Sequence, residues 1–130
     1  MSPEVAPVSK KRLWIGRVLS ALPVLMLLFS ATLKFLNTQE VRTGMAQLGY
    51  PESQTIKLGI VEIACTILYI IPNTAVLGAI LLTAYLGGAT ATHVRVGDPF
   101  IGPPILGILL WLGLYLRDRR LGDLVPIRRG

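Results

Sequence analysis

Long apolar blocks constrain this chain more than any other feature of its sequence. They cover about residues 13–36, 55–71, 74–94 and 103–116. The first three have roughly 17–24 residues, the length that a helix needs to cross about 30 Å of hydrocarbon. Lipid offers the backbone no hydrogen-bond partners, so a single segment that crosses it must be helical. The pattern predicts an all-α membrane protein in which residues 13–116 form one domain, a four-transmembrane-helix bundle.

The fourth block is shorter than the others, but its ends favour a crossing. Pro103 and Pro104 fit the first turn of a helix, where a missing N–H removes no intrahelical bond. Helix tilt and snorkelling of Arg117 can make up the missing length. The composition agrees, because only 15% of residues are charged, whereas a soluble domain averages about 25%. The first block exceeds the roughly 7–15 apolar residues of a signal peptide, so we expect it to be retained.

Positive charge is concentrated in two tails, residues 1–12 and 117–130. Short segments rich in lysine and arginine remain on the cytoplasmic side of a membrane. We therefore expect a multi-pass protein with both termini in the cytoplasm, which requires an even number of crossings. The net charge of +6 then needs no nucleic acid to explain it, because topology and attraction to the anionic lipid of the bilayer account for it.

Two further patterns describe how the helices connect and pack. Residues 38–49 place apolar side chains on one face, which predicts a short interfacial amphipathic helix between helices one and two. In the third block, Gly87 and Ala91 share one four-residue spacing and Gly88 lies on another. Small residues at this spacing let helix backbones approach closely. We expect them to pack inside the bundle, and contacts within a homo-oligomer are the alternative.

Glu62 is the most informative single residue, because it lies well inside the second block. A charge at that depth costs about 2.5–3.5 kcal/mol and is seldom found there without a partner or a function. Polar or small residues recur along this helix at steps of four and three, and we expect the resulting stripe to face the bundle interior. The stripe consists of Thr55, Gly59, Glu62, Thr66 and Tyr69. The predicted topology brings Lys34, His93 and Arg95 to the same level of the outer leaflet.

This polar cluster has two interpretations. Lys34 and Glu62 could form a buried ion pair that fixes helix register. Alternatively, the cluster lines a shallow pocket for a quinone head group, an anion or a proton path. The chain has one cysteine, Cys65, and one histidine. These counts exclude a dithiol relay and bis-histidine haem ligation within one chain, and we expect neither a metal nor a covalent cofactor.

Several motifs resemble those of the DoxX-like family of small bacterial membrane proteins. They lie between residues 13 and 120 and comprise Gly16-Arg17, Lys34-Phe35-Leu36, Leu48-Gly49-Tyr50-Pro51, Gly59 to Ile63, Pro72 to Gly78 and His93 to Pro99. The resemblance implies a four-helix bundle of the bacterial cytoplasmic (inner) membrane, with Arg17, Lys34, Glu62 and His93 as family-typical polar positions. It also suggests a quinone-linked role, since the family name comes from a subunit of an archaeal thiosulfate:quinone oxidoreductase.

Three functional hypotheses follow, and the sequence assigns catalytic residues to none of them. The first is a quinone-linked accessory subunit or membrane anchor of a soluble or membrane oxidoreductase, which would itself carry the electrons. The second is a structural or assembly protein without chemistry. The third is a carrier of a small solute or protons, which at this length would have to act as an oligomer. The first is preferred, and it makes the chain a non-catalytic subunit rather than an enzyme on its own.

Overall fold

A computed structural model describes residues 8–123, and every regular element in this range is helical. In chain order the α-helices are α1 (Lys10–Leu36), α2 (Gln39–Gln47), α3 (Glu52–Ile70), α4 (Ala75–Val96) and α5 (Gly102–Arg117). Two short 3₁₀ helices, Pro72–Thr74 and Arg119–Asp123, lie before α4 and after α5. The sequence predicted the five α-helices to within a few residues, but neither of the 3₁₀ helices. The basic residues from Lys10 onward belong to α1 rather than to a tail, while residues 1–7 and 124–130 lie outside the described range.

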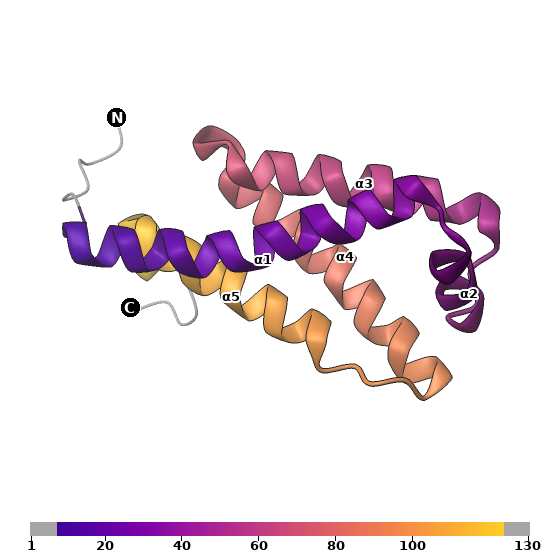
Figure 1. Cartoon of the computed structure of the whole chain (residues 1–130). Coiled ribbons are helices and arrows are strands. Elements are labelled where there is room, and N and C mark those ends of the chain that lie inside the picture. Colours follow the sequence, from indigo (N-terminus) through magenta and orange to yellow (C-terminus); the bar gives the residue numbers. More distant parts are fainter. Residues whose placement is uncertain (1–7, 124–130) are drawn as a thin grey trace.

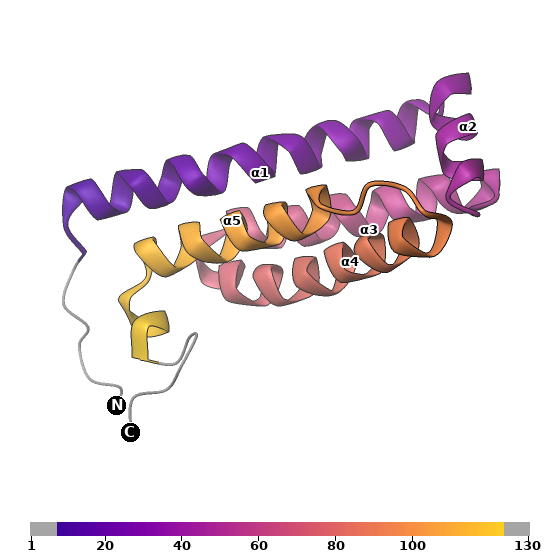
Figure 2. The ribbon, with the colours of Figure 1, turned by 90° about the horizontal axis from the view of Figure 1, so that it is seen from below.

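The four long helices form a closed ring, which Figures 1 and 2 show from two directions. Helix α1 packs on α3 and α5, and α4 packs on the same two helices from the other side. The short helix α2 lies across one end of the bundle, here called the α2 end. At the opposite end, the tail end, Arg12 donates to the carbonyls of Tyr115 and Leu116, so the start of α1 lies beside the end of α5.

Local signals explain where the helices begin and end. The Ser9 side chain accepts a hydrogen bond from the Arg12 amide and so caps the start of α1. Asn37 ends this helix in the left-handed region, at φ 49°, and Thr38 caps α2. Gly97 ends α4 with φ 77°, a conformation that glycine adopts without steric cost. These caps fix the turns that place α2 and the α4–α5 link at the same end of the bundle.

The burial pattern is that of a protein surrounded by lipid. Large apolar side chains point outward along every long helix, including Leu25, Phe29, Ile60, Ile80 and Ile108. The stripe predicted on α3 faces inward, and Glu62, Thr55 and Thr66 are among its buried members. By length and composition, three helical segments can cross a membrane: Lys10–Leu36, Glu52–Ile70 and Pro72–Val96. Helix α5 is apolar but shorter, so the four-crossing count remains a prediction.

The glycines of the bundle differ in role from the prediction. A Cβ on Gly113 would overlap the Ser20 Oγ and lie 2.8 Å from the Gly16 carbonyl oxygen, so α1 and α5 cross in close contact there. In contrast, a Cβ on Gly87 or Gly88 would meet no atom within 4 Å. Ala91, on the same face as Gly87, is exposed. The expected close packing within the chain is therefore not found at these α4 positions.

Candidate functional site

The Glu62 carboxylate is held by groups from α1. Its Oε1 accepts hydrogen bonds from Lys34 Nζ at 3.0 Å and from Ser30 Oγ at 3.3 Å. Lys34 Nζ also donates to Ser30 Oγ at 2.8 Å, which closes a three-membered network. The Glu62 side chain is 2% exposed and that of Lys34 is 14% exposed. The structure thus brings Lys34 and Glu62 together, as a charge at this depth requires.

Packing on α3 makes this approach feasible. A Cβ on Gly59, one turn before Glu62, would lie 3.1 Å from the Lys34 Cβ. The glycine therefore lets the lysine stem pass along α3 and deliver its ammonium group to the carboxylate. The hydrogen bonds from Lys34 and Ser30 both end on the Oε1 atom of the carboxylate.

A cavity of about 500 Å³ lies beside this network, and we call it the head-group cavity. It lies between α1, α4 and the start of α5, and Glu62 reaches it from α3. Helix α5 begins only at Gly102, so it does not fill the space between α1 and α4 near the α2 end. Most lining residues are apolar. The polar ones are Ser30, Lys34, Glu62, Tyr85 and His93.

His93 enters the cavity in a defined tautomer. Its Nδ1 lies 2.6 Å from the Ala89 carbonyl oxygen, one helical turn earlier. A carbonyl can only accept a hydrogen bond, so Nδ1 carries the proton. In the neutral ring Nε2 is then an unprotonated acceptor, and in the charged ring it is a second donor. His93 can therefore either accept a proton from a bound group or donate a hydrogen bond to it.

Two smaller cavities adjoin the head-group cavity on the side of α2. One, of about 270 Å³, includes Tyr50 and Thr92, whose hydroxyl groups are 2.9 Å apart. The other, of about 330 Å³, extends under α2 to the half-buried Asp98. Lys34 and His93 line all three cavities. These two side chains thus stand between the buried carboxylate and the α2 end of the bundle.

Two predicted site residues lie elsewhere. The Arg95 side chain is turned to the loop after α2, where its Nη2 donates to the Leu48 carbonyl at 2.7 Å and passes close to Gly49. This bond holds the loop in place. Arg17 lies near the tail end, where its guanidinium stacks 5.1 Å from the centre of the Trp14 ring. It is separated from Lys34 by about 25 Å along α1.

Thr66 and Tyr69 belong to the same stripe as Glu62 but not to its cavity. The Thr66 hydroxyl donates to the Glu62 backbone carbonyl at 2.7 Å, so it is satisfied within α3. The Tyr69 hydroxyl forms a second network nearer the tail end. Its partners are Ser20 Oγ at 2.9 Å, the Leu110 carbonyl at 2.6 Å and Arg117 Nη2 at 3.2 Å. This network joins α1, α3 and α5 and has a structural role.

Tyr85 is the site residue that the sequence prediction missed. It lines both the head-group cavity and the adjoining cavity with Tyr50. Glu62 lines the head-group cavity as well. Tyr85, Ala89 and His93 follow one another at four-residue spacing on α4, which places them on one face. That spacing was the signal that could have identified Tyr85.

A metal centre finds no support in the described part of the chain. Residues 8–123 contain no group of three or more histidine, cysteine, aspartate or glutamate side chains that could hold a metal ion. The single cysteine, Cys65, is buried on α3.

Comparison with known proteins identifies one family. The sequence model of the DoxX-like family matches residues 18–114, which include Lys34, Glu62, Tyr85 and His93. Neither a curated protein nor a solved structure gave a significant match.

Proposed function

The chain belongs to the DoxX-like family of membrane proteins, and on this premise we propose that it is a quinone-linked accessory subunit or membrane anchor of an oxidoreductase. One observation supports this proposal above the others. Three titratable side chains from three helices, Lys34, Glu62 and His93, converge on a single cavity of about 500 Å³ whose walls are otherwise mostly apolar. Ligand sites commonly combine an apolar wall with a few converging polar groups.

The residues of the cavity fit a quinone head group. A ring with two carbonyl oxygens needs apolar contact on its faces and hydrogen-bond donors at its edges. Leu27, Leu86 and Leu106 supply the first. Lys34 Nζ, the Tyr85 hydroxyl and protonated His93 Nε2 are the available donors. When bound, a quinone supplies two-electron, two-proton chemistry, and the protein contributes binding, orientation and electrostatics.

Proton exchange is the task that these side chains are suited to perform. The Glu62 carboxylate and, in the neutral ring, His93 Nε2 are acceptors beside the same cavity, and Lys34 holds the carboxylate in position. The chain has one cysteine and one histidine, so it lacks the ligand pairs of a dithiol relay or bis-histidine haem. Electrons would therefore come from a partner protein, which makes this chain a non-catalytic subunit.

The test is purification in mild detergent, with extraction and mass spectrometry of bound quinones and of co-purifying proteins. Wild type is compared with Glu62→Gln at matched expression. Glu52→Gln is the control, since it removes a carboxylate that is 62% exposed and lies on the surface. We expect quinone to be retained by wild type and Glu52→Gln and lost from Glu62→Gln. Equal quinone content in all three proteins, or none in wild type, would contradict the proposal.

A structural role is the second candidate, and the completeness of the Lys34–Ser30–Glu62 network favours it. Each of the three side chains is hydrogen-bonded to the other two, so the network links α1 to α3 without a ligand. This role predicts that Glu62→Gln lowers the amount of folded protein while wild type contains no quinone. The proposed binding role predicts loss of quinone from Glu62→Gln protein that is still folded.

A further inference from the structure

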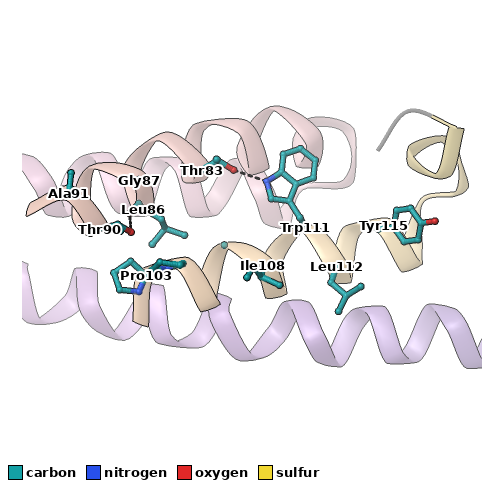
Figure 3. Close-up of a pocket in the computed structure, with 12 residues that line it drawn as sticks. Thr83, Leu86, Gly87, Thr90, Ala91, Pro103, Ile108, Trp111, Leu112 and Tyr115 are labelled. Carbon is teal, nitrogen blue, oxygen red and sulfur yellow. Dashed lines mark hydrogen bonds between the residues drawn. The ribbon is translucent and has the colours of Figure 1, made fainter. Parts of the chain in front are cut away.

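A second, larger hollow lies outside the head-group cavity, along the seam between α4 and α5. It has a volume of about 940 Å³, and we call it the α4–α5 groove. Figure 3 shows its lining residues in a row, from Ala91 and Pro103 at one end to Trp111 and Tyr115 at the other. Because it is open on one side of the bundle and its walls are apolar, it would face lipid in a membrane.

Three polar side chains in the groove are satisfied within the chain. Trp111 Nε1 donates to the Thr83 hydroxyl at 2.6 Å, and Thr83 in turn donates to the Ala79 carbonyl at 2.7 Å. The Thr90 hydroxyl donates to the Leu86 carbonyl at 2.8 Å. Apart from Tyr115 at the tail end, the other lining side chains are apolar. An occupant that extends along the groove would therefore be apolar over most of its length.

The groove lies next to the head-group cavity. Leu86 and Pro103 line both of them, one from α4 and the other from the start of α5. A single molecule could therefore place a polar ring beside Glu62 and pass its apolar remainder around Pro103 into the groove. The shapes and linings of the two hollows together fit an amphiphile that has one compact polar head and one long apolar tail.

Small residues repeat along the groove wall on α4. Thr83, Gly87 and Ala91 lie at four-residue spacing, about 6 Å apart along the helix axis. A Cβ on Gly87 would meet nothing within 4 Å, and Gly107 on α5 faces only the Leu86 side chain. The open space at these glycines suits a tail that carries methyl branches better than a straight chain. We propose that the α4–α5 groove holds the polyisoprenoid tail of the quinone whose head group occupies the cavity, an inference that rests on the function proposed above.

The test measures how affinity depends on the tail. Protein in nanodiscs is loaded with a tritiated short-chain quinone, which is displaced by quinones with the same ring and a long polyisoprenoid or a straight alkyl tail. Concentrations are expressed as mole fractions of lipid. Gly87→Leu fills the groove where the structure offers open space, so the fold is expected to tolerate it. Ile80→Phe adds bulk to the same helix at a lipid-facing position outside the groove.

We expect the polyisoprenoid quinone to displace the probe at about threefold lower mole fraction than the short-chain quinone, because in a bilayer only packing distinguishes protein from lipid contacts. Gly87→Leu should abolish this advantage and leave short-chain binding unchanged, and Ile80→Phe should retain it.

Three results would overturn the proposal: equal affinity for all tails, a tail advantage that survives Gly87→Leu, or a change of oligomeric state in that variant, which would assign the groove to a second copy. Failure of the proposed function is distinct, since the short-chain quinone would then not bind saturably.

Discussion

At the scale of single residues, the central feature is a carboxylate that is 2% exposed and a lysine that reaches it. Burying two charges costs several kcal/mol each, and their mutual attraction offsets this cost only when further hydrogen bonds complete the geometry. Ser30 supplies these bonds, because it contacts both partners. The pair is therefore stable as a unit, whereas either charge alone would not be.

Removing one charge of this pair should destabilise the protein more than removing both. Glu62→Gln leaves the Lys34 ammonium without a counter-charge, which should lower the free energy of unfolding by about 1.5–3 kcal/mol. The double variant Lys34→Met/Glu62→Gln should regain part of this loss, because no buried charge remains. Denaturant titration in detergent micelles measures both values. Additive losses in the double variant would show that the two side chains do not act as a pair.

At the scale of elements, the crossing of α1 and α5 depends on glycine. Gly16 and Gly113 face each other, and a Cβ on either would lie within 3 Å of the backbone oxygen of the other. Gly113→Ala should therefore cost about 1–3 kcal/mol, which is typical of overpacked sites. Gly102→Ala is the control, because its Cβ would meet no atom within 4 Å. Thermal unfolding in detergent should show a lower Tm for Gly113→Ala alone, and equal Tm values would contradict the predicted close approach.

The end of α5 provides a pH-dependent contact. Hydrogen bonds from Arg120 lower the pKa of Asp118 below its ordinary value. A carboxyl group whose pKa is lower in the folded state stabilises that state above its unfolded pKa, about 3.9, and loses this effect as the pH falls through the folded pKa. Asp118→Asn should thus be less stable than wild type at pH 7, with the difference shrinking in acid. A difference that is independent of pH, measured by thermal unfolding at several pH values, would exclude this contact as its cause.

Local sequence patterns predicted the helices and the polar stripe of α3, because the apolar blocks and the four- and three-residue steps are properties of single segments. They also suggested that Lys34 and Glu62 meet, since an isolated charge is too costly at that depth. They did not locate Arg95, whose partner is the Leu48 carbonyl, because a backbone carbonyl carries no sequence signal. The open faces of Gly87 and Gly88 were missed for a related reason, since spacing alone does not reveal which neighbour covers a given face.

At the scale of the whole molecule, the arrangement of the ring determines where a site can form. Helices α1 and α4 lie across the ring from each other, and α5 closes the gap between them over only part of its length. The late start of α5 therefore creates the head-group cavity near the α2 end. Lys34 and His93 separate this cavity from the smaller one that extends to Asp98. A proton that moves between Glu62 and the α2 end would therefore pass Lys34 and His93.

Which side of the membrane this is can be predicted and tested. The basic residues at the start of α1 and the end of α5 should be cytoplasmic, so the α2 end should face outward. Replacement of the single cysteine by Cys65→Ala gives a background for His93→Cys, Asp98→Cys, Lys11→Cys and Arg119→Cys. In intact cells, a membrane-impermeant thiol reagent should label Asp98→Cys rapidly and His93→Cys more slowly, because His93 lies within α4 whereas Asp98 lies in the loop after it. Lys11→Cys and Arg119→Cys should react only after permeabilisation. Labelling of both in intact cells would contradict the predicted orientation. Labelling of Arg119→Cys without Lys11→Cys would show that α5 does not complete the fourth crossing.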